Sequence, residues 1–382
     1  MKFSFEWLKA HLETSASAEE IADKLTAIGL EVEALSNPAE ALAPFVIARV
    51  IAADKHPQAD KLQVLTVDAG QGSVQVVCGA PNAHAGMLGV FGPPGAYIPG
   101  SDLTLKVATI RGVESHGMMC SVRELQLGDE HEGIIELADD APVGAAFAAW
   151  AGLDDPVFDV NVTPNRQDCM GVRGIARDLA AAGMGTLKPL GVPQIEGSFS
   201  CPVPVSITDP EGCPAFFGRA IKGVTNGASP DWMQRRLKSA GQRPISALVD
   251  ITNYVMLEHG RPAHAYDIAR LKGGLTARAA EPGEKVLALN EKEYTLEPFM
   301  TVIADDAQVH DIGGIMGGED SGVTAATTDV MLEVAYFTPQ RISRTGQALG
   351  LTSDARSRFE RGVDPAFLDD GLAILTGLIL DI

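Results

Sequence analysis

The feature that most constrains the fold is a series of short strand-like segments between residues 45 and 145. Segments such as FVIARV, KLQVLTV and SVQVVC are rich in apolar and β-branched residues, and turns rich in Gly, Pro and Asn separate them. Short strands at such close intervals predict a small closed or partly open barrel. The segment EGIIELADDAPVG ends this block, so we assign residues 41–149 to the barrel.

Helical patterns flank the barrel on both sides. SAEEIADKLTAIG places Ser17 and Glu20 in capping-box register and ends at a glycine, and SNPAEALAP follows it as a short linker. Beyond the barrel, a strand ends at Pro164 and a second helix follows, with Asp168 as its expected N-cap. Neither helix has a core of its own. We therefore expect residues 1–40 and 150–195 to form one small α/β domain into which the barrel is inserted.

A Pro- and Gly-rich boundary precedes the last part of the chain. Strand patterns such as PAFFGRAIKGV and VMLEVAYF alternate irregularly with helical ones such as SPDWMQRRLKSAG, which indicates a mixed α+β domain over residues 200–382. The expected fold class is thus α+β and multi-domain, with 46% hydrophobic residues available for the cores.

The formal net charge of −20 argues against nonspecific wrapping of nucleic acid, which requires a basic surface. A local basic patch is still present at Arg235, Arg236, Lys238 and Arg243. It is either a contact for nucleic acid or an ordinary solvated helix face.

Cysteine and histidine usage restricts the compartment and the chemistry. The five cysteines form no CxxC pair and the eight histidines show no metal-ligand spacing, so we expect neither a disulfide framework nor a bound metal. No apolar stretch reaches the roughly 18 residues that a membrane span needs, and the start MKFSFEWLKAHLE has no signal core. These features predict a cytoplasmic protein without membrane contact.

Four features of the last domain each have a functional and an ordinary explanation. Glu333 interrupts the apolar strand VMLEVAYF, either as a buried pocket residue or as a solvent-facing one. HDIGGIMGGEDSG is either a loop that approaches a ligand or a tight hairpin. His264 in RPAHAYD is either a site residue or a structural histidine. The charged segment SDARSRFERGVDP is explained equally well by a surface ion network and by a site.

The motifs together resemble one family, the bacterial phenylalanine–tRNA ligase β subunit, in its N-terminal half. The resemblance rests on HPQADKLQVLTVDAG, VCGAPN, IRGVESHGMMCS and DEHEGIIEL in the barrel block, and on TPNRQDCMGVRGIARDLAA, DITNYVMLEHGRPAHAYD, GGIMGGEDSGV and SDARSRFERGVDP after it. It implies an OB-fold tRNA-binding domain and a B3/B4-type editing domain that hydrolyses mischarged Tyr-tRNA(Phe). Family members run to about twice this length, so the chain resembles a fragment.

The resemblance also implies partners and cofactors. The full enzyme would be a heterotetramer of two α and two β subunits that charges tRNA(Phe) with the help of ATP and Mg²⁺. No cofactor is expected in this fragment. Candidate tRNA contacts are Lys55 and Lys61 in the barrel, together with Arg235, Arg236, Lys238 and Arg243.

The family's editing pocket carries over to particular residues of this chain. Glu333 falls on the reader of the tyrosine hydroxyl. The other matching positions are Thr252, Asn253, His264, Gly314, Gly317, Ser353 and Ala355. Ser353 stands where many members have threonine, and Tyr266 where others often carry phenylalanine. A positioned water is the expected nucleophile, with His264 possible as general base.

Two other functions are also compatible with this sequence. The chain could be a non-enzymatic tRNA-binding or scaffold module with an inert pocket. It could also be a free-standing trans-editing deacylase, although the apolar helix GLAILTGLILDI at the end of the chain argues against an autonomous protein.

Overall fold

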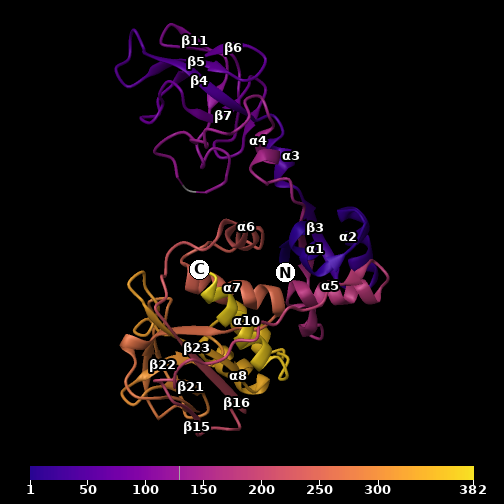
Figure 1. Cartoon of the computed structure of the whole chain (residues 1–382), viewed down its shortest axis with the longest axis vertical. Helices are drawn as coiled ribbons and strands as arrows, with labels where there is room; N and C mark the ends of the chain where they lie inside the picture. Colours follow the sequence, from indigo (N-terminus) through magenta and orange to yellow (C-terminus); the bar gives the residue numbers. More distant parts are fainter. Residues whose placement is uncertain (129) are drawn as a thin grey trace. The chain divides into compact units, whose positions relative to one another are not determined.

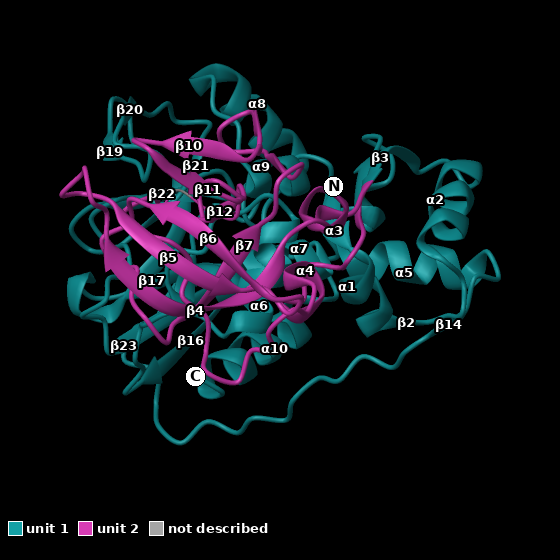
Figure 2. Cartoon of the chain, turned by 90° about the horizontal axis from the view of Figure 1, so that it is seen from above, with its two compact units in different colours: residues 1–35, 158–382 teal, residues 36–157 magenta. Residues whose placement is uncertain are grey.

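The structure, a computed structural model, describes residues 1–128 and 130–382, so Asp129 of the DEHEGIIEL motif lies outside the described residues. The chain divides into two compact units, one formed by residues 1–35 and 158–382 and the other by residues 36–157 (Figures 1 and 2). Each unit is described by itself below. Within the described residues, no helix is long and apolar enough to cross a membrane.

The unit of residues 36–157 is built on a five-stranded antiparallel sheet. Its strands follow the order β12 (Met118–Met119), β7 (Leu88–Gly92), β4 (Val46–Lys55), β5 (Gln63–Asp68) and β6 (Ser73–Cys78). The two edges come together because the Val77 amide donates to Ser115 Oγ at 3.0 Å and the His116 amide donates to the Gln75 carbonyl at 2.8 Å. The sheet is therefore a nearly closed barrel, as predicted.

Smaller elements complete this unit. They are α3 (Pro38–Leu42), β8 (Tyr97–Ile98), β9 (Leu103–Thr104), β10 (Ala108–Ile110), β11 (Val113–Ser115) and α4 (Phe147–Trp150). The prediction of SNPAEALAP as a linker is wrong in part, because the segment contains α3. The Asn37 side chain caps this helix, and Pro38 begins it.

The first part of the other unit combines residues from both sides of the barrel. β13 (Val157–Asn161) lies between β1 (Lys2–Ser4) and β3 (Glu31–Ser36) in one sheet. The further elements are α1 (Phe5–His11), β2 (Leu12–Glu13), α2 (Ala18–Ala27), η1 (Gln167–Cys169), α5 (Val172–Ala181) and β14 (Thr186–Leu187). The predicted capping box at the start of α2 is present, with reciprocal bonds between Ser17 and Glu20. The exact domain limits stay a prediction.

The prediction of Asp168 as a helix N-cap is wrong. α5 begins at Val172 with Gly171 as its N-cap, and Asp168 lies in the preceding 3₁₀ turn. Its carboxylate accepts hydrogen bonds from the Arg166 and Arg177 guanidinium groups, each at 3.1 Å. Gly171 is required at the cap because a Cβ there would lie 2.4 Å from the Gly260 amide nitrogen. Helix α1 was not predicted at all.

Two sheets and several helices form the rest of this unit. One sheet has the order β16 (Ala215–Lys222), β23 (Asp329–Tyr336), β17 (His264–Asp267), and the other β15 (Val205–Ile207), β18 (Leu275–Ala279), β21 (Thr301–Ala304), β22 (Val309–Ile312). A hairpin joins β19 (Lys285–Leu287) to β20 (Glu293–Thr295). The helices are α6 (Asp231–Ser239), α7 (Ala247–His259), η2 (Ile268–Arg270), α8 (Pro339–Leu349), α9 (Asp354–Phe359) and α10 (Leu368–Leu380).

Strand β23 is central to this architecture because both of its faces are covered. Val330, Leu332 and Val334 belong to the core formed with α7 and α10, whereas Met331 and Ala335 belong to the core formed with the four-stranded sheet (Figure 1). The alternation of side chains along a strand turns Glu333 toward the second core. Glu333 is 7% exposed, so the solvent-facing alternative is wrong.

Candidate functional site

Glu333 is positioned by antiparallel pairing on both sides of β23. It stands directly opposite His264 of β17 and opposite Gly218 of β16. Cross-strand partners project from the same face of a sheet, so the His264 ring and the Glu333 carboxyl are neighbours on one side. On the neighbouring strand β16, Gly218 has no side chain that could contact the Glu333 carboxyl.

The Glu333 carboxyl has a partner that the sequence did not reveal. The Tyr266 hydroxyl lies within hydrogen-bonding distance of both Glu333 Oε2 and Asp311 Oδ2. Asp311 belongs to β22 of the facing sheet, and its Oδ1 accepts a hydrogen bond of 2.9 Å from the Gly318 amide. Burial, reinforced by the nearby Asp311 carboxylate and opposed by the Tyr266 hydrogen bond, raises the pKa of Glu333 to about 8.

His264 lies beside this group. Its ring centroid is 4.5 Å from that of Tyr266, and its Nε2 is 3.8 Å from Asp311 Oδ1. Nε2 is buried and has no hydrogen-bond partner in the part of the chain that the structure describes. Gly317 closes over the ring, since a Cβ at this position would lie 2.5 Å from His264 Cε1. The structure thus brings three of the predicted residues together: Glu333, His264 and Gly317.

Three further predicted residues form a neighbouring group around the glycine-rich loop. Gly314 has a φ of +69°, and a Cβ there would lie 2.7 Å from Phe337 Cδ2. Ser353 caps α9 by accepting from the Arg356 amide at 3.0 Å and donates to the Ile315 carbonyl at 2.6 Å. Ala355 packs against the core that contains Phe337 and the four-stranded sheet. A tight turn explains Gly314, and a ligand role for the loop stays a prediction.

Thr252 and Asn253 lie on another element, and their place in the pocket stays a prediction. Both lie on α7, which packs against the face of β23 opposite to the Glu333 carboxyl. The Thr252 hydroxyl donates to the Val249 carbonyl of its own helix at 2.8 Å. Over residues 1–128 and 130–382, no hydrogen bond joins either side chain to Glu333.

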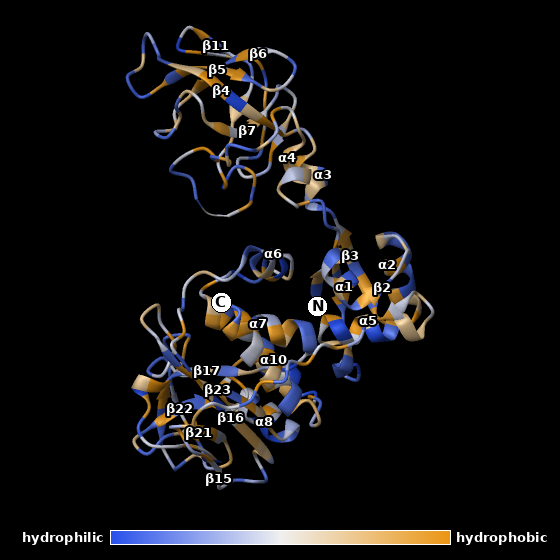
Figure 3. Cartoon of the chain, viewed as in Figure 1, coloured by the Kyte–Doolittle hydropathy of each residue, from blue (hydrophilic) through white to orange (hydrophobic). Residues whose placement is uncertain are grey.

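The basic residues of α6 and the loop after it are not equivalent. Arg235, Lys238 and Arg243 are exposed, and α6 is drawn largely in hydrophilic colours in Figure 3. Arg236 differs because its guanidinium donates to the Tyr254 hydroxyl at 2.7 Å and lies 5.2 Å from the centre of the Trp232 ring. Packing therefore accounts for Arg236. Lys55 and Lys61 are exposed in the unit of residues 36–157.

A second buried carboxylate, Glu258 of α7, joins distant segments of the chain. It pairs with His11 Nε2 at 2.9 Å and His259 Nε2 at 3.2 Å, and it accepts a hydrogen bond from the Tyr254 hydroxyl. Burial alone would raise the pKa of Glu258, but the bonds from the two histidines outweigh it and lower the pKa. The Trp7 ring stacks on Tyr254 at 5.5 Å. This cluster fastens α1 to α7.

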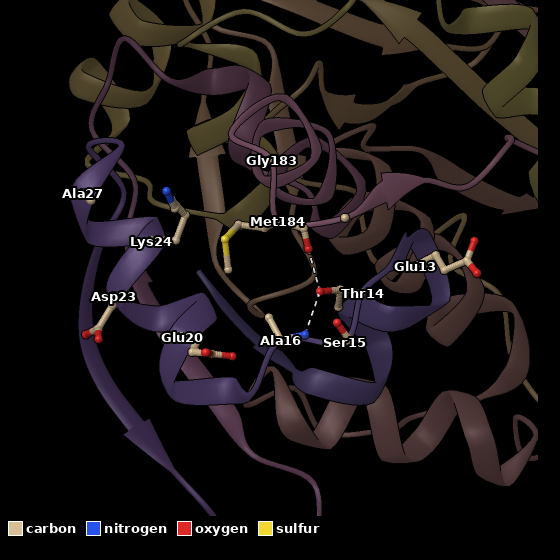
Figure 4. A pocket seen from close by; sticks show the side chains of 11 residues that line it. Glu13, Thr14, Ser15, Ala16, Glu20, Asp23, Lys24, Ala27, Gly183 and Met184 are labelled. Carbon is tan, nitrogen blue, oxygen red and sulfur yellow. Dashed lines mark hydrogen bonds between the residues drawn. The ribbon is translucent and has the colours of Figure 1, made fainter.

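Two hollows lie away from the Glu333 group. One, of about 850 Å³, is lined by α2 and the turn at Gly183–Gly185; the Thr14 hydroxyl there donates to the Met184 carbonyl at 2.6 Å (Figure 4). The other, of about 560 Å³, lies in the barrel unit between Val77 and Ile134. Neither is lined by a residue predicted for the pocket.

Asp168, Cys169 and Asp178 are close enough to share a cation. Arg166 already neutralises both carboxylates, at 3.1 Å and 2.7 Å. An ion-pair cluster is therefore sufficient to explain this group.

Tyr266 and Asp311 are parts of the site that were not predicted from the sequence. Tyr266 was noted only as a departure from the family pattern. A signal for Asp311 existed, since β22 reads VHDI and all four residues are buried. A buried carboxylate requires a partner.

Two family models and several curated proteins match this chain. Residues 45–146 match the family described as a putative tRNA binding domain, and residues 212–382 match the B3/4 domain family. The chain is 67% identical over 383 residues to the phenylalanine–tRNA ligase beta subunit of Novosphingobium aromaticivorans, which covers 100% of this chain and 48% of that relative. The chain belongs to the phenylalanine–tRNA ligase β-subunit family.

The other matches are consistent with this membership. The beta subunit of Zymomonas mobilis is 61% identical over 382 residues, again 100% of this chain and 48% of the relative. The chain spans about half the length of the curated relatives it matches. Among solved structures, an N-terminal fragment of the Pyrococcus horikoshii phenylalanyl-tRNA synthetase beta-subunit shares 19% identity, covering 52% of this chain and 61% of that one, with a TM-score of 0.30. A likeness this low carries no argument.

Proposed function

We propose that this chain is the tRNA-binding and editing portion of a phenylalanine–tRNA ligase β subunit, and that its B3/4 domain hydrolyses Tyr-tRNA(Phe). The observation that carries the proposal is the buried Glu333, which is paired across strands with His264, whose ring Gly317 closes over. Relatives named as this subunit and the two family matches support the assignment.

Such a site is needed because tyrosine differs from phenylalanine by one hydroxyl. A hydrophobic synthetic pocket rejects an isostere with an added hydroxyl by a factor of only about 10². A second site that requires the hydroxyl supplies the rest. Glu333 suits this task because its carboxyl accepts a hydrogen bond from the phenol and is left without it beside phenylalanine.

The proposed reaction is hydrolysis of the aminoacyl ester. A water oxygen attacks the ester carbonyl carbon, the bond to the ribose oxygen breaks, and that oxygen leaves with a proton, giving free tyrosine and tRNA. Positioning and electrostatics would supply most of the rate enhancement. His264 is a candidate for a contact to the substrate, because its buried Nε2 has no hydrogen-bond partner among the described residues.

The proposed tRNA contacts are exposed basic side chains: Lys55 and Lys61 in the barrel unit, and Arg235, Lys238 and Arg243 on and after α6. Arg236 is not included because its guanidinium is engaged with Tyr254. Because each cation that neutralises a phosphate releases counterions, binding through these side chains should be modest and should weaken with salt.

The chain's role in the whole enzyme is part of the same proposal. The full β subunit would assemble with the α subunit as a heterotetramer in the cytoplasm and support ATP- and Mg²⁺-dependent synthesis of Phe-tRNA(Phe). This chain's residues would supply editing and tRNA binding.

The deciding experiment is hydrolysis of Tyr-tRNA(Phe) by the chain, with Phe-tRNA(Phe) as the control substrate and Glu333→Ala as the control variant. We expect wild type to release tyrosine above the uncatalysed rate and to spare the phenylalanyl ester. Release at the uncatalysed rate would favour the non-enzymatic tRNA-binding module. Full activity in Glu333→Ala would contradict the role given to Glu333.

A further inference from the structure

The Tyr266 hydroxyl has more acceptors than it can serve. It faces Glu333 Oε2 and Asp311 Oδ2 at once, yet a hydroxyl carries one proton. If both carboxyl groups were ionised, one of the two contacts would place two oxygens together with no hydrogen between them. The geometry therefore requires one additional proton, bound to a carboxyl.

The environment of the two carboxyls shows which one carries it. Asp311 Oδ1 already accepts the Gly318 amide, and the His264 ring lies on the same side, so Asp311 is the better-stabilised anion. Glu333 has no contact with an N–H donor across the described ranges 1–128 and 130–382. The proton then runs in one direction: Glu333 donates to Tyr266, and Tyr266 donates to Asp311.

We infer that Tyr266 and Asp311 are positioning residues that hold Glu333 as a neutral acid, so that Glu333 Oε1 recognises a ligand hydroxyl as an uncharged acceptor. This inference deepens the proposed function and rests on it for the identity of the ligand. Tyr266 stands where other family members often carry phenylalanine, and this difference thus acquires a role. A phenylalanine at this position could neither accept a hydrogen bond from Glu333 nor donate one to Asp311.

Neutrality has a direct consequence for selectivity. A carboxylate left without a partner in a buried pocket costs far more than a neutral carbonyl oxygen. A neutral Glu333 therefore leaves no uncompensated charge when no phenol is bound, and it still distinguishes a phenol from a phenyl ring through one hydrogen bond.

Within the described residues, several titratable groups surround the Glu333 carboxyl. They are Tyr266 and His264 from β17, Asp311 from β22, Cys213 just before β16, and His310, whose ring lies 6.3 Å from that of Tyr266. His310 is paired with Asp305 at 2.8 Å. Asp311 is the group whose charge acts most directly on Glu333.

The first test observes the proton itself. Infrared difference spectra of the full chain, labelled with ¹³C-glutamate, should show a protonated glutamate carboxyl near pH 7 that is absent in Glu333→Gln. Asp311→Asn should lower its titration midpoint by at least one pH unit, because a neighbouring negative charge is removed. Asp320→Asn removes the same charge from an exposed position and should leave the midpoint in place.

The second test separates a neutral reader from a charged one. The Glu333→Gln side chain keeps a carbonyl acceptor and an N–H that can donate to Tyr266, so it should retain most of the preference for Tyr-tRNA(Phe), whereas Glu333→Ala loses it. Loss of preference in Glu333→Gln equal to that in Glu333→Ala would overturn the inference.

The two tests also distinguish this inference from the proposed function. No protonated carboxyl in wild type, or an unchanged midpoint in Asp311→Asn, overturns the inference even if the chain edits. A protonated Glu333 in a chain that neither hydrolyses Tyr-tRNA(Phe) nor binds tyrosine supports the proton assignment and overturns the function. If Asp311→Asn fails to fold, the infrared spectra and the substrate preference of wild type and Glu333→Gln still decide whether Glu333 is a neutral acid.

Discussion

At the scale of single residues, the buried carboxyl of Glu333 should leave a signature in the pH dependence of stability. Its pKa is about 8 in the folded chain against an ordinary value of 4.5. A raised folded-state pKa means that the stabilisation is complete below about pH 4.5 and is lost as the pH rises to about 8, at about 1.4 kcal/mol per pH unit.

The variant Glu333→Gln removes this dependence. The difference in unfolding free energy between wild type and variant should therefore move in the variant's favour between pH 5 and 8, by several kcal/mol in total. Urea denaturation at a series of pH values measures it. A difference that stays constant over this range would mean that Glu333 is ionised when folded.

Gly317 offers a second residue-scale prediction. An added Cβ would lie 2.5 Å from His264 Cε1 and 3.1 Å from Leu289 Cδ1, so Gly317→Ala must displace the ring. We expect a loss of about 1–3 kcal/mol in stability and a reduced rate of Tyr-tRNA(Phe) hydrolysis. Gly197→Ala, where a Cβ would meet nothing within 4 Å, is the matched control. Equal activity of the two variants would show that His264 needs no fixed position.

At the scale of elements, Ser353 connects the start of α9 to the glycine-rich loop. Its hydroxyl both caps the helix and donates to the Ile315 carbonyl. Ser353→Ala should cost about 1–2 kcal/mol in thermal or chemical unfolding, because the cap and the tie to the loop are lost together. Ser353→Thr keeps the hydroxyl and should remain near wild type. An unchanged free energy of unfolding in Ser353→Ala would show that the loop holds its shape without this bond.

The elements also show where the sequence was informative. Periodicity and turn residues were sufficient for the barrel, for α2 with its capping box and for β23, because these signals are local. They failed at Asp168, where a 3₁₀ turn and the close approach of Gly171 to Gly260 decide where α5 starts. They failed at Tyr266 and Asp311 as well, since only the packing of two sheets brings β17 and β22 together. The pattern marked Glu333 as an outlier in an apolar strand and left two explanations open, and the resemblance to the family gave it a role.

At the scale of the whole molecule, Glu258 links α1 of the first segment to α7. Its carboxylate is 7% exposed and is shared by His11, His259 and Tyr254. Glu258→Ala should cost about 3–5 kcal/mol, because partners of a buried charge are left unpaired. The lowered pKa of Glu258 means that wild type loses this stabilisation only at strongly acidic pH, as the carboxyl takes up its proton.

Calorimetry of wild type and Glu258→Ala provides the comparison, and the exposed Glu297→Ala is the control. A change in melting temperature no larger than that of the control would mean that α1 and α7 stay together without the cluster.

In the function proposed above, the B3/4 domain detects one hydroxyl through Glu333. The most direct test is the melting temperature of the chain with free tyrosine or free phenylalanine at the same concentration. A ligand that binds only the folded state stabilises it by about 2.7 kcal/mol at a hundred times its Kd, and this stabilisation raises the melting temperature. We expect a rise with tyrosine, little or none with phenylalanine, and no difference between the two in Glu333→Ala. An equal rise with both amino acids in wild type would contradict this expectation.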